Sequence, residues 1–182
     1  DPIDGTSNYI SGGKEYTINI ALIQNGEPTI GLIAHPPSKN IWIAIKDKLF
    51  LYNSVVDIKV TITQESVCKE YPGIIISKEN NKKTEEFLRS IKNKNIMHVS
   101  SSLKFCYLVS KKAIIYPRFS NIKKWDIAAG HAILKASGGF LLKLDGKEFK
   151  YNYPSEFSEE FLASSFKNWR DTFQFIKPIN FL

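Results

Sequence analysis

The stretch DPIDGT, residues 1–6, places two carboxylates three positions apart in a turn that contains proline and glycine. After a glycine-rich segment, the run YTINIALI at residues 16–23 mixes alternating and continuous apolar positions, a pattern that predicts a strand. The dipeptide Asn25-Gly26 is a strong hairpin signal, and a second strand is predicted at 29–34. The sequence therefore sets a carboxylate-rich turn directly before a β-hairpin.

Outward from this turn, strand signals dominate for about seventy residues, and strands and helices alternate beyond them. We predict further strands at 41–45, 48–52, 58–63, 73–77, 97–99, 113–116, 140–144, 147–151 and 161–166. We predict helices at 81–91, 103–110 and 125–137, and a helical segment near 169–175. The pattern indicates an α/β fold with two domains, an antiparallel-rich sheet at 1–72 and an α/β domain with a mixed sheet at 73–182.

The composition is that of a folded protein, because 43% of the 182 residues are hydrophobic and 24% are charged. No apolar run approaches the ~20 residues that a transmembrane helix needs. The net charge of +7 has two readings, a lysine-rich solvated surface or attraction to an anionic small molecule. The basic clusters are short and no nucleic-acid-binding motif accompanies them, so we expect no nucleic-acid polymer as a partner.

The two cysteines, Cys68 and Cys106, lie far apart and form no CxxC pair. We therefore expect neither a disulfide framework nor a zinc site. A reducing cytoplasm fits this cysteine usage, and association with the inner face of a bacterial membrane is an alternative. No signal peptide is visible, although the chain starts at Asp1 without a methionine, which leaves its true N-terminus open.

The DPIDGT turn has the chemistry of a metal site. Asp1 and Asp4 can converge on one point together with the carbonyl of Ile3, and hard oxygen ligands of this type suit Mg²⁺. The amides of Gly5 and Thr6 follow directly, and exposed turn amides can cradle a phosphate. The Thr6 hydroxyl is placed to take a proton from an attacking water. The alternative is an Asx turn that caps a strand.

A third candidate ligand comes from WDIAAG at residues 125–130. Asp126 stands at the start of the predicted helix, where the helix dipole favours a carboxylate, so an ordinary N-cap or first-turn aspartate is the alternative. Two Mg²⁺ ions need more negative charge than one turn supplies, and a carboxylate from a distant element meets that need. The small residues at 128–130 permit close approach of the helix to the turn. His131 in the same helix is interpreted as structural rather than as a metal ligand.

A candidate anion site lies between these two motifs in the sequence. SSSLKFC at residues 100–106 sets hydroxyls and Lys104 at the start of a predicted helix, an arrangement that binds anions. YPRF at 116–119 adds Arg118, whose guanidinium presents a fork of donors to phosphate. A substrate with a second phosphate needs such a basic pocket. The alternative is an N-cap serine, a solvated lysine and a salt-bridged arginine.

These motifs together resemble those of a known family. DPIDGT, followed far downstream by WDIAAGHAI at 125–133 and a Gly-Gly pair, is similar to the two signatures of the inositol monophosphatase superfamily. SSLKFC at 101–106 and YPRF at 116–119 resemble segments of its CysQ-type 3′(2′),5′-bisphosphate nucleotidases. The resemblance implies the layered sugar-phosphatase fold and a small phosphorylated nucleotide as partner. It also implies lithium-sensitive hydrolysis of the 3′-phosphate of adenosine 3′,5′-bisphosphate to AMP and phosphate, with two or more Mg²⁺ ions as cofactors.

The resemblance assigns roles to the candidate site residues. The expected Mg²⁺ ligands are Asp1, the Ile3 carbonyl, Asp4 and Asp126. The expected catalytic residues are Thr6, which orients the attacking water, and Asp4. The scissile phosphate is expected to bind the amides of Gly5 and Thr6, and Asp126 is expected to contact the substrate as well. The phosphate that is not cleaved is expected to bind Ser101, Lys104 and Arg118.

The sequence departs from the family pattern at three places. No counterpart of the family's N-terminal segment, with its glutamate ligand and its water-activating acidic residue, is found ahead of Asp1. Ser7-Asn8 replaces the Lys-Glu usual in CysQ proteins and is nearer to the inositol monophosphatase pattern. SKEN at 77–80 stands where many relatives carry a histidine-containing loop.

These departures leave two alternatives open beside the nucleotidase. One is an inositol monophosphatase-like sugar phosphatase. The other is a non-catalytic remnant, because three carboxylates do not balance the charge of two Mg²⁺ ions, and the free α-amino group of Asp1 adds a positive charge nearby. We expect the chain as written to be weak or inactive, and the sequence does not predict its oligomeric state.

Overall fold

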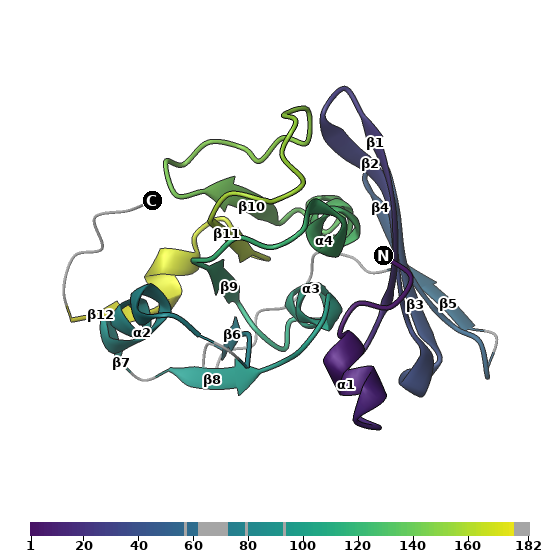
Figure 1. Cartoon of the computed structure of the whole chain (residues 1–182), viewed down its shortest axis with the longest axis horizontal. Helices are drawn as coiled ribbons and strands as arrows, with labels where there is room; N and C mark the ends of the chain where they lie inside the picture. The colour runs from purple at the N-terminus through teal and green to yellow at the C-terminus, as the bar shows by residue number, and fades with distance from the viewer. Residues whose placement is uncertain (57, 62–72, 79, 93, 177–182) are drawn as a thin grey trace.

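Two sheets with helices between them form the molecule (Figure 1). The computed structural model describes residues 1–56, 58–61, 73–78, 80–92 and 94–176. The helices α3, Leu103–Val109, and α4, Lys124–Ala136, lie between the two main sheets. Among the described residues, no helix combines the length and the apolar character needed to cross a bilayer.

The first sheet is antiparallel throughout, with the order β1-β2-β3-β4-β5. Its strands are β1 Ile18–Gln24, β2 Glu27–His35, β3 Asn40–Ile45, β4 Lys48–Asn53 and β5 Ile58–Thr61. Asn25 and Gly26 turn the chain between β1 and β2 with φ angles of 52° and 77°, the backbone that a two-residue hairpin requires. The antiparallel-rich sheet predicted for the first part of the chain is confirmed.

The second sheet is mixed, with the order β10-β11-β9-β6-β8. Its strands are β6 Gly73–Ile76, β8 Asn95–His98, β9 Ile115–Arg118, β10 Phe140–Lys143 and β11 Phe161–Ser164. β6 pairs in parallel with β8 and β9, whereas β11 is antiparallel to β9 and β10. All four residues of β6 are buried, as expected for a strand covered on both faces. The predicted mixed sheet is also confirmed.

Helix α4 joins the two halves of the molecule. It packs on β1 and β2 of the first sheet and on helix α3. Gly31 in β2 permits the first contact, because a Cβ there would lie 2.6 Å from the carbonyl oxygen of Ala129. Gly130 permits the second, because a Cβ there would lie 2.1 Å from the ring of Phe105. Small residues in the WDIAAG motif therefore set how closely α4, which carries Asp126, approaches both layers.

Two segments differ from the predicted elements because tertiary contacts reorganise them. The strand predicted at 147–151 is reduced to a single bridge between Leu142 and Glu148. The buried ring of Phe149 packs instead against His131 of α4. The helical segment predicted near 169–175 divides into a 3-10 turn and a short strand, η2 Trp169–Thr172 and β12 Gln174–Phe175.

The start of the chain also differs from prediction, since the turn-rich region contains a short helix, α1 Thr6–Ile10. The other short elements are η1 Pro36–Ser38, α2 Lys82–Arg89 and β7 Ile91–Lys92, which pairs with β12. The predicted boundary near residue 72 falls outside the described residues, as does Cys68. Cys106 is buried in α3 as a free thiol.

Candidate active site

The DPIDGT turn is anchored to the first strand of the antiparallel sheet. Asp4 and Thr17 form an antiparallel bridge with backbone hydrogen bonds of 2.9 and 3.0 Å, and the amide of Asn19 donates to the carbonyl of Asp1 at 2.8 Å. Gly5 takes a φ of 86°, and a Cβ there would lie 2.7 Å from a backbone carbonyl oxygen. Glycine alone fits this position, so the turn holds both aspartates on a firm base.

Local hydrogen bonds show that the predicted Asx turn is present. The amide of Ile3 donates to Oδ1 of Asp1 at 2.9 Å, and the hydroxyl of Thr6 donates to the carbonyl of Ile3 at 2.9 Å. This turn does not exclude metal binding, because Asp1 retains a second carboxylate oxygen. The Thr6 hydroxyl thus contacts the Ile3 carbonyl, which is the predicted Mg²⁺ ligand.

The fold brings Asp126 to this turn. Asp1, Asp4 and Asp126 each offer a carboxylate oxygen, and these three atoms lie within 4.8 Å of one another. All three residues are partly buried. Asp126 lies in the first turn of α4, but the N-cap of that helix is Lys123. The N-cap part of the alternative is therefore wrong and the first-turn part is confirmed, while the packing of α4 also places Asp126 in the carboxylate cluster.

The electrostatics of the cluster favour a bound cation. Burial and the neighbouring charge of Asp4 raise the pKa of Asp126 from 3.8 to about 6, because both disfavour its ionised form. A divalent cation would relieve this repulsion. Three carboxylates together with turn carbonyls are the hard oxygen donors that Mg²⁺ prefers, so the donor set fits that ion.

Two buried side chains that the sequence did not single out support the cluster. Ser102 donates its amide and its hydroxyl to Oδ2 of Asp4 at 2.6 and 2.7 Å. Asn19 donates through Nδ2 to the Ser102 hydroxyl at 2.8 Å and to Asp4 at 3.3 Å. The serine triplet at 100–102 is the only sequence signal for this contact, and it does not reveal which serine faces the carboxylates.

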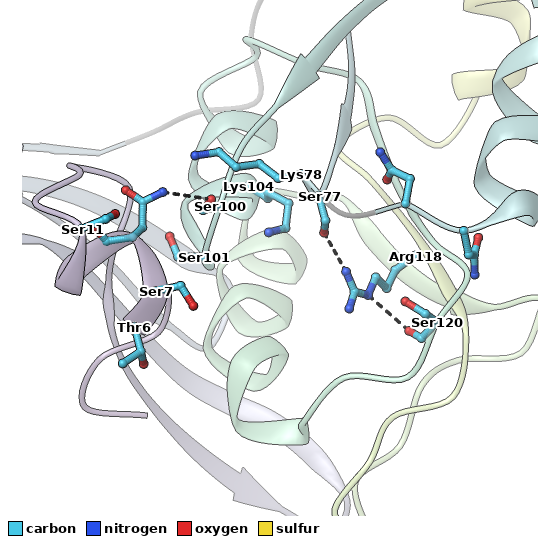
Figure 2. Close-up of a pocket in the computed structure, with 14 residues that line it drawn as sticks. Thr6, Ser7, Ser11, Ser77, Lys78, Ser100, Ser101, Lys104, Arg118 and Ser120 are labelled. Carbon is cyan, nitrogen blue, oxygen red and sulfur yellow. Dashed lines mark hydrogen bonds between the residues drawn. The ribbon is translucent and has the colours of Figure 1, made fainter.

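A polar cavity of about 800 Å³ opens beside the turn (Figure 2). Its lining residues come from α1, from the segment after β6, from the start of α3 and from the end of β9. The described lining consists of glycine and polar residues: Gly5, Thr6, Ser7, Asn8, Ser11, Ser77, Lys78, Asn80, Asn81, Ser100, Ser101, Lys104, Arg118 and Ser120. Three of these carry positive charge and none carries a carboxylate, so the cavity suits an anionic ligand.

Lys104 lies in the wall of this cavity and is only 7% exposed. Its ammonium donates to the carbonyl of Val99 at 3.2 Å and lies 5.3 Å from the ring centre of Tyr116. Burial lowers the pKa of Lys104 from 10.5 to about 8; the charge of Asp4 raises this pKa and that of Arg118 lowers it, both by less than burial does. The solvated-lysine alternative is therefore wrong, and this buried cation would be stabilised by a bound anion.

Arg118 is held in place by two serines (Figure 2). Its Nε donates to the carbonyl of Ser120 at 3.2 Å, and its Nη1 donates to the hydroxyl of Ser77 at 2.6 Å. Within the described part of the chain Arg118 forms no ion pair, so the salt-bridged alternative finds no support there. The remaining guanidinium donors are available to a ligand.

Ser101 lies where the anion cavity meets the carboxylate cluster. Its φ of 58° is left-handed. The N-cap of α3 is a serine, Ser102, as the alternative held, but its side chain makes no capping hydrogen bond and contacts Asp4 instead. A second cavity of about 160 Å³ shares lining residues with the larger one. Its lining is Asp4, Ser101, Lys104, Phe105, Tyr116, Arg118, Ile122 and Asp126. Predicted metal ligands and predicted anion-binding residues thus line adjoining cavities.

His131 lies outside this arrangement. Its Nδ1 is 3.2 Å from the hydroxyl of Tyr151, and burial lowers the pKa of the imidazole from 6.5 to about 3. Among the described residues, the group of side chains placed to bind a metal is Asp1, Asp4 and Asp126, without His131. These contacts support the structural interpretation of this histidine.

Known proteins share both the sequence pattern and the fold. The inositol monophosphatase family matches residues 1–170. The chain is 35% identical over 168 residues to the 3′(2′),5′-bisphosphate nucleotidase CysQ of Buchnera aphidicola, covering 91% of this chain and 61% of that protein. It is 32% identical over 152 residues to CysQ of Escherichia coli K12, covering 83% of this chain and 60% of that protein.

The crystal structure of CysQ from Bacteroides thetaiotaomicron superposes with a TM-score of 0.80 at 27% identity, covering 90% of this chain and 68% of that one. The chain spans about three fifths of the length of the curated relatives it matches. The family match extends over most of the chain and includes both carboxylate motifs and the anion-binding segments. The chain belongs to the inositol monophosphatase family.

Proposed function

We propose that the full gene product is a Mg²⁺-dependent phosphatase that hydrolyses the 3′-phosphate of adenosine 3′,5′-bisphosphate to AMP and phosphate. The observation that carries this proposal is the common wall of the two cavities, in which Ser101, Lys104 and Arg118 adjoin the carboxylates Asp4 and Asp126. A substrate with two phosphates can place one at the carboxylate cluster and the other in the basic cavity. The resemblance to CysQ proteins supports the same substrate class.

The carboxylate cluster is the proposed site for two or more Mg²⁺ ions. The ligands would be Asp1, the Ile3 carbonyl, Asp4 and Asp126. When bound, the ions supply Lewis-acid stabilisation of the attacking and leaving oxygens of an in-line displacement.

The chain's own residues orient the scissile phosphate and the water. The amides of Gly5 and Thr6 point from the start of α1 and are the proposed donors to the phosphate oxygens. The Thr6 hydroxyl donates its hydrogen bond to the Ile3 carbonyl, so its oxygen lone pairs are left to accept a hydrogen bond from the attacking water. Asp4 is the second proposed catalytic residue, and Asp126 is proposed to contact the substrate.

The basic cavity is the proposed site for the phosphate that is not cleaved. Lys104 contributes a buried ammonium, Arg118 contributes a guanidinium that Ser77 and Ser120 orient, and Ser101 contributes a hydroxyl. Hydrogen bonds from charged donors contribute roughly 1.5–3 kcal/mol each. The second phosphate therefore supplies binding free energy that a monophosphate lacks.

One observation favours the alternative of an inositol monophosphatase-like sugar phosphatase. The described lining of the larger cavity contains no aromatic side chain on which a nucleobase would stack. Asn8, which lies in this lining, also matches the pattern of that group more closely. The remaining alternative is a non-catalytic remnant, and a cytoplasmic location and the division at 1–72 and 73–182 stay predictions.

The test measures phosphate release by the full gene product from adenosine 3′,5′-bisphosphate and from inositol 1-phosphate, with and without Mg²⁺. Mg²⁺-dependent preference for the bisphosphate is the expected result. Preference for the monophosphate would retain the metal site and replace the substrate. Absence of release from both would favour the remnant.

A further inference from the structure

Ser102 occupies a position where four elements of the fold meet. It lies at the start of α3 and is 2% exposed. Its hydroxyl oxygen is 2.7 Å from Oδ2 of Asp4 in the DPIDGT turn and 2.7 Å from the carbonyl oxygen of Asp126 in α4. Asn19 in β1 donates to the same hydroxyl at 2.8 Å. One side chain thus contacts both segments that carry the three clustered carboxylates.

The hydrogen-bond donors of Ser102 and Asn19 fix the position of the Asp4 carboxylate. The amide of Ser102 donates to Oδ2 of Asp4 at 2.6 Å whatever the hydroxyl does. The hydroxyl accepts from Asn19 and has one proton, which goes either to Asp4 or to the carbonyl of Asp126. Oδ2 of Asp4 can therefore receive up to three hydrogen bonds, and among the described residues its other oxygen receives none.

This bonding matters because the two carboxylates repel each other. Asp4 and Asp126 belong to a cluster whose carboxylate oxygens lie within 4.8 Å of one another, a distance at which like charges repel. Without a connection between their segments, repulsion favours a wider spacing when no cation is bound. Ser102 joins the side chain of Asp4 to the backbone of Asp126 and opposes that separation.

We propose that Ser102 is a positioning residue that sets the affinity of the carboxylate cluster for divalent cations. It acts through Asp4 and Asp126 and makes no contact with the reacting atoms. The role in turnover rests on the proposed function, whereas the effect on cation binding does not depend on the substrate. Residues that orient metal ligands in this way typically change metal affinity or activity by about 10- to 100-fold when replaced.

The test compares Ser102→Ala with the wild type in the full gene product. Mn²⁺ binding is measured by electron paramagnetic resonance, and the Mg²⁺ concentration for half-maximal phosphate release is measured in parallel. We expect the Kd for Mn²⁺ and the half-maximal Mg²⁺ concentration each to rise about 10-fold or more in Ser102→Ala. The KM for the phosphorylated substrate at saturating Mg²⁺ should change less than about threefold. Ser102→Thr retains the hydroxyl and is expected to recover most of the affinity.

Ser164→Ala is the matched control. Ser164 is fully buried in β11, donates to the carbonyl of Ile114 at 2.9 Å and accepts from the amide of Phe166 at 3.0 Å. Its loss should lower the Tm by an amount similar to that of Ser102→Ala, with unchanged Mn²⁺ affinity. If Ser102→Ala does not fold, Asn19→Ala removes the donor to the Ser102 hydroxyl and is expected to weaken Mn²⁺ binding in the same direction.

The outcomes separate this inference from the proposed function. Weaker Mn²⁺ binding in Ser102→Ala, together with no release from either substrate by the wild type, would support the positioning role and contradict the proposed function. Equal Mn²⁺ affinity in wild type, Ser102→Ala and Ser164→Ala would overturn the positioning role. Absence of Mn²⁺ binding by the wild type would overturn it as well.

Discussion

The carboxylate cluster and the basic cavity are built in opposite ways. Two of the three clustered carboxylates come from a single turn, whereas Lys104, Arg118 and the supporting Ser77 come from three separate elements. In both regions burial disfavours the charged form of one side chain, Asp126 in the cluster and Lys104 in the cavity. In the cluster, burial and like charge raise the pKa of Asp126, and in the cavity burial lowers the pKa of Lys104. Each region is therefore preorganised for a ligand of opposite charge.

The two regions also stabilise each other. Asp4 raises the pKa of Lys104, and Lys104 lowers the pKa of Asp126, although burial outweighs both effects. The comparison teaches that a buried lysine and partly buried carboxylates can adjoin without forming an ion pair, so that both remain available to ligands. The variants below separate the contributions of the two regions.

The largest expected effect follows from removing one charge of the cluster. Asp126→Asn should reduce Mg²⁺-dependent turnover by roughly 10³-fold or more, because it removes a proposed metal ligand and its charge. Phosphate release by the full gene product is the measurement. Asp145→Asn, a change in an exposed turn, is the control. Activity retained in Asp126→Asn would contradict the metal assignment.

The second effect tests the basic cavity alone. Arg118→Met should raise KM for adenosine 3′,5′-bisphosphate by roughly 10- to 150-fold, the equivalent of the 1.5–3 kcal/mol of hydrogen bonds to a charged group. KM for a monophosphate should change less than about threefold. Steady-state kinetics on both substrates provide the measurement, with Arg170→Met as a control at a distant arginine. Equal changes on both substrates would show that Arg118 does not distinguish the second phosphate.

The third effect tests the contact between α3, which carries Lys104, and α4, which carries Asp126. Gly130→Ala should lower the free energy of unfolding by about 1–3 kcal/mol, because a Cβ would lie 2.1 Å from the ring of Phe105. Urea unfolding provides the measurement. Phe105→Leu in the same chain should recover part of the loss, and additive losses in the double variant would contradict a direct clash.

The smallest expected effect concerns stability in the absence of ligand. Burial lowers the folded-state pKa of Lys104 from 10.5 to about 8. Between pH 8 and pH 10.5 the unfolded chain therefore binds more protons than the folded chain, and the free energy of unfolding rises with pH. Lys104→Met should remove this rise and stabilise the protein at pH 7 by about 1–2 kcal/mol, less than the ~3 kcal/mol equivalent of the full shift. Thermal unfolding from pH 6 to 10 is the measurement, and a parallel pH profile in the variant would contradict the assignment.

Local sequence was sufficient for the turn and for most strands and helices. The spacing of Asp1 and Asp4, the hairpin at Asn25-Gly26 and the helix that begins before Asp126 all depend on interactions between neighbouring residues. Helix α1 was not predicted, because its five residues carry no strong helical pattern. Asn8 in α1 bonds to Ser100 and to the amide of Glu15, so distant contacts support this helix.

By itself the sequence determined the type of chemistry: hard oxygen ligands in one turn, a further carboxylate at a helix start, and cationic donors between them. The tertiary structure alone decided that Asp126 reaches Asp4, that Lys104 is buried rather than solvated, and that Ser102 rather than Ser101 holds the carboxylate of Asp4. The physical reason is that ligand type and turn geometry follow from adjacent residues. Burial, pKa and the orientation of one serine among three depend on how α3, α4 and the first sheet pack together.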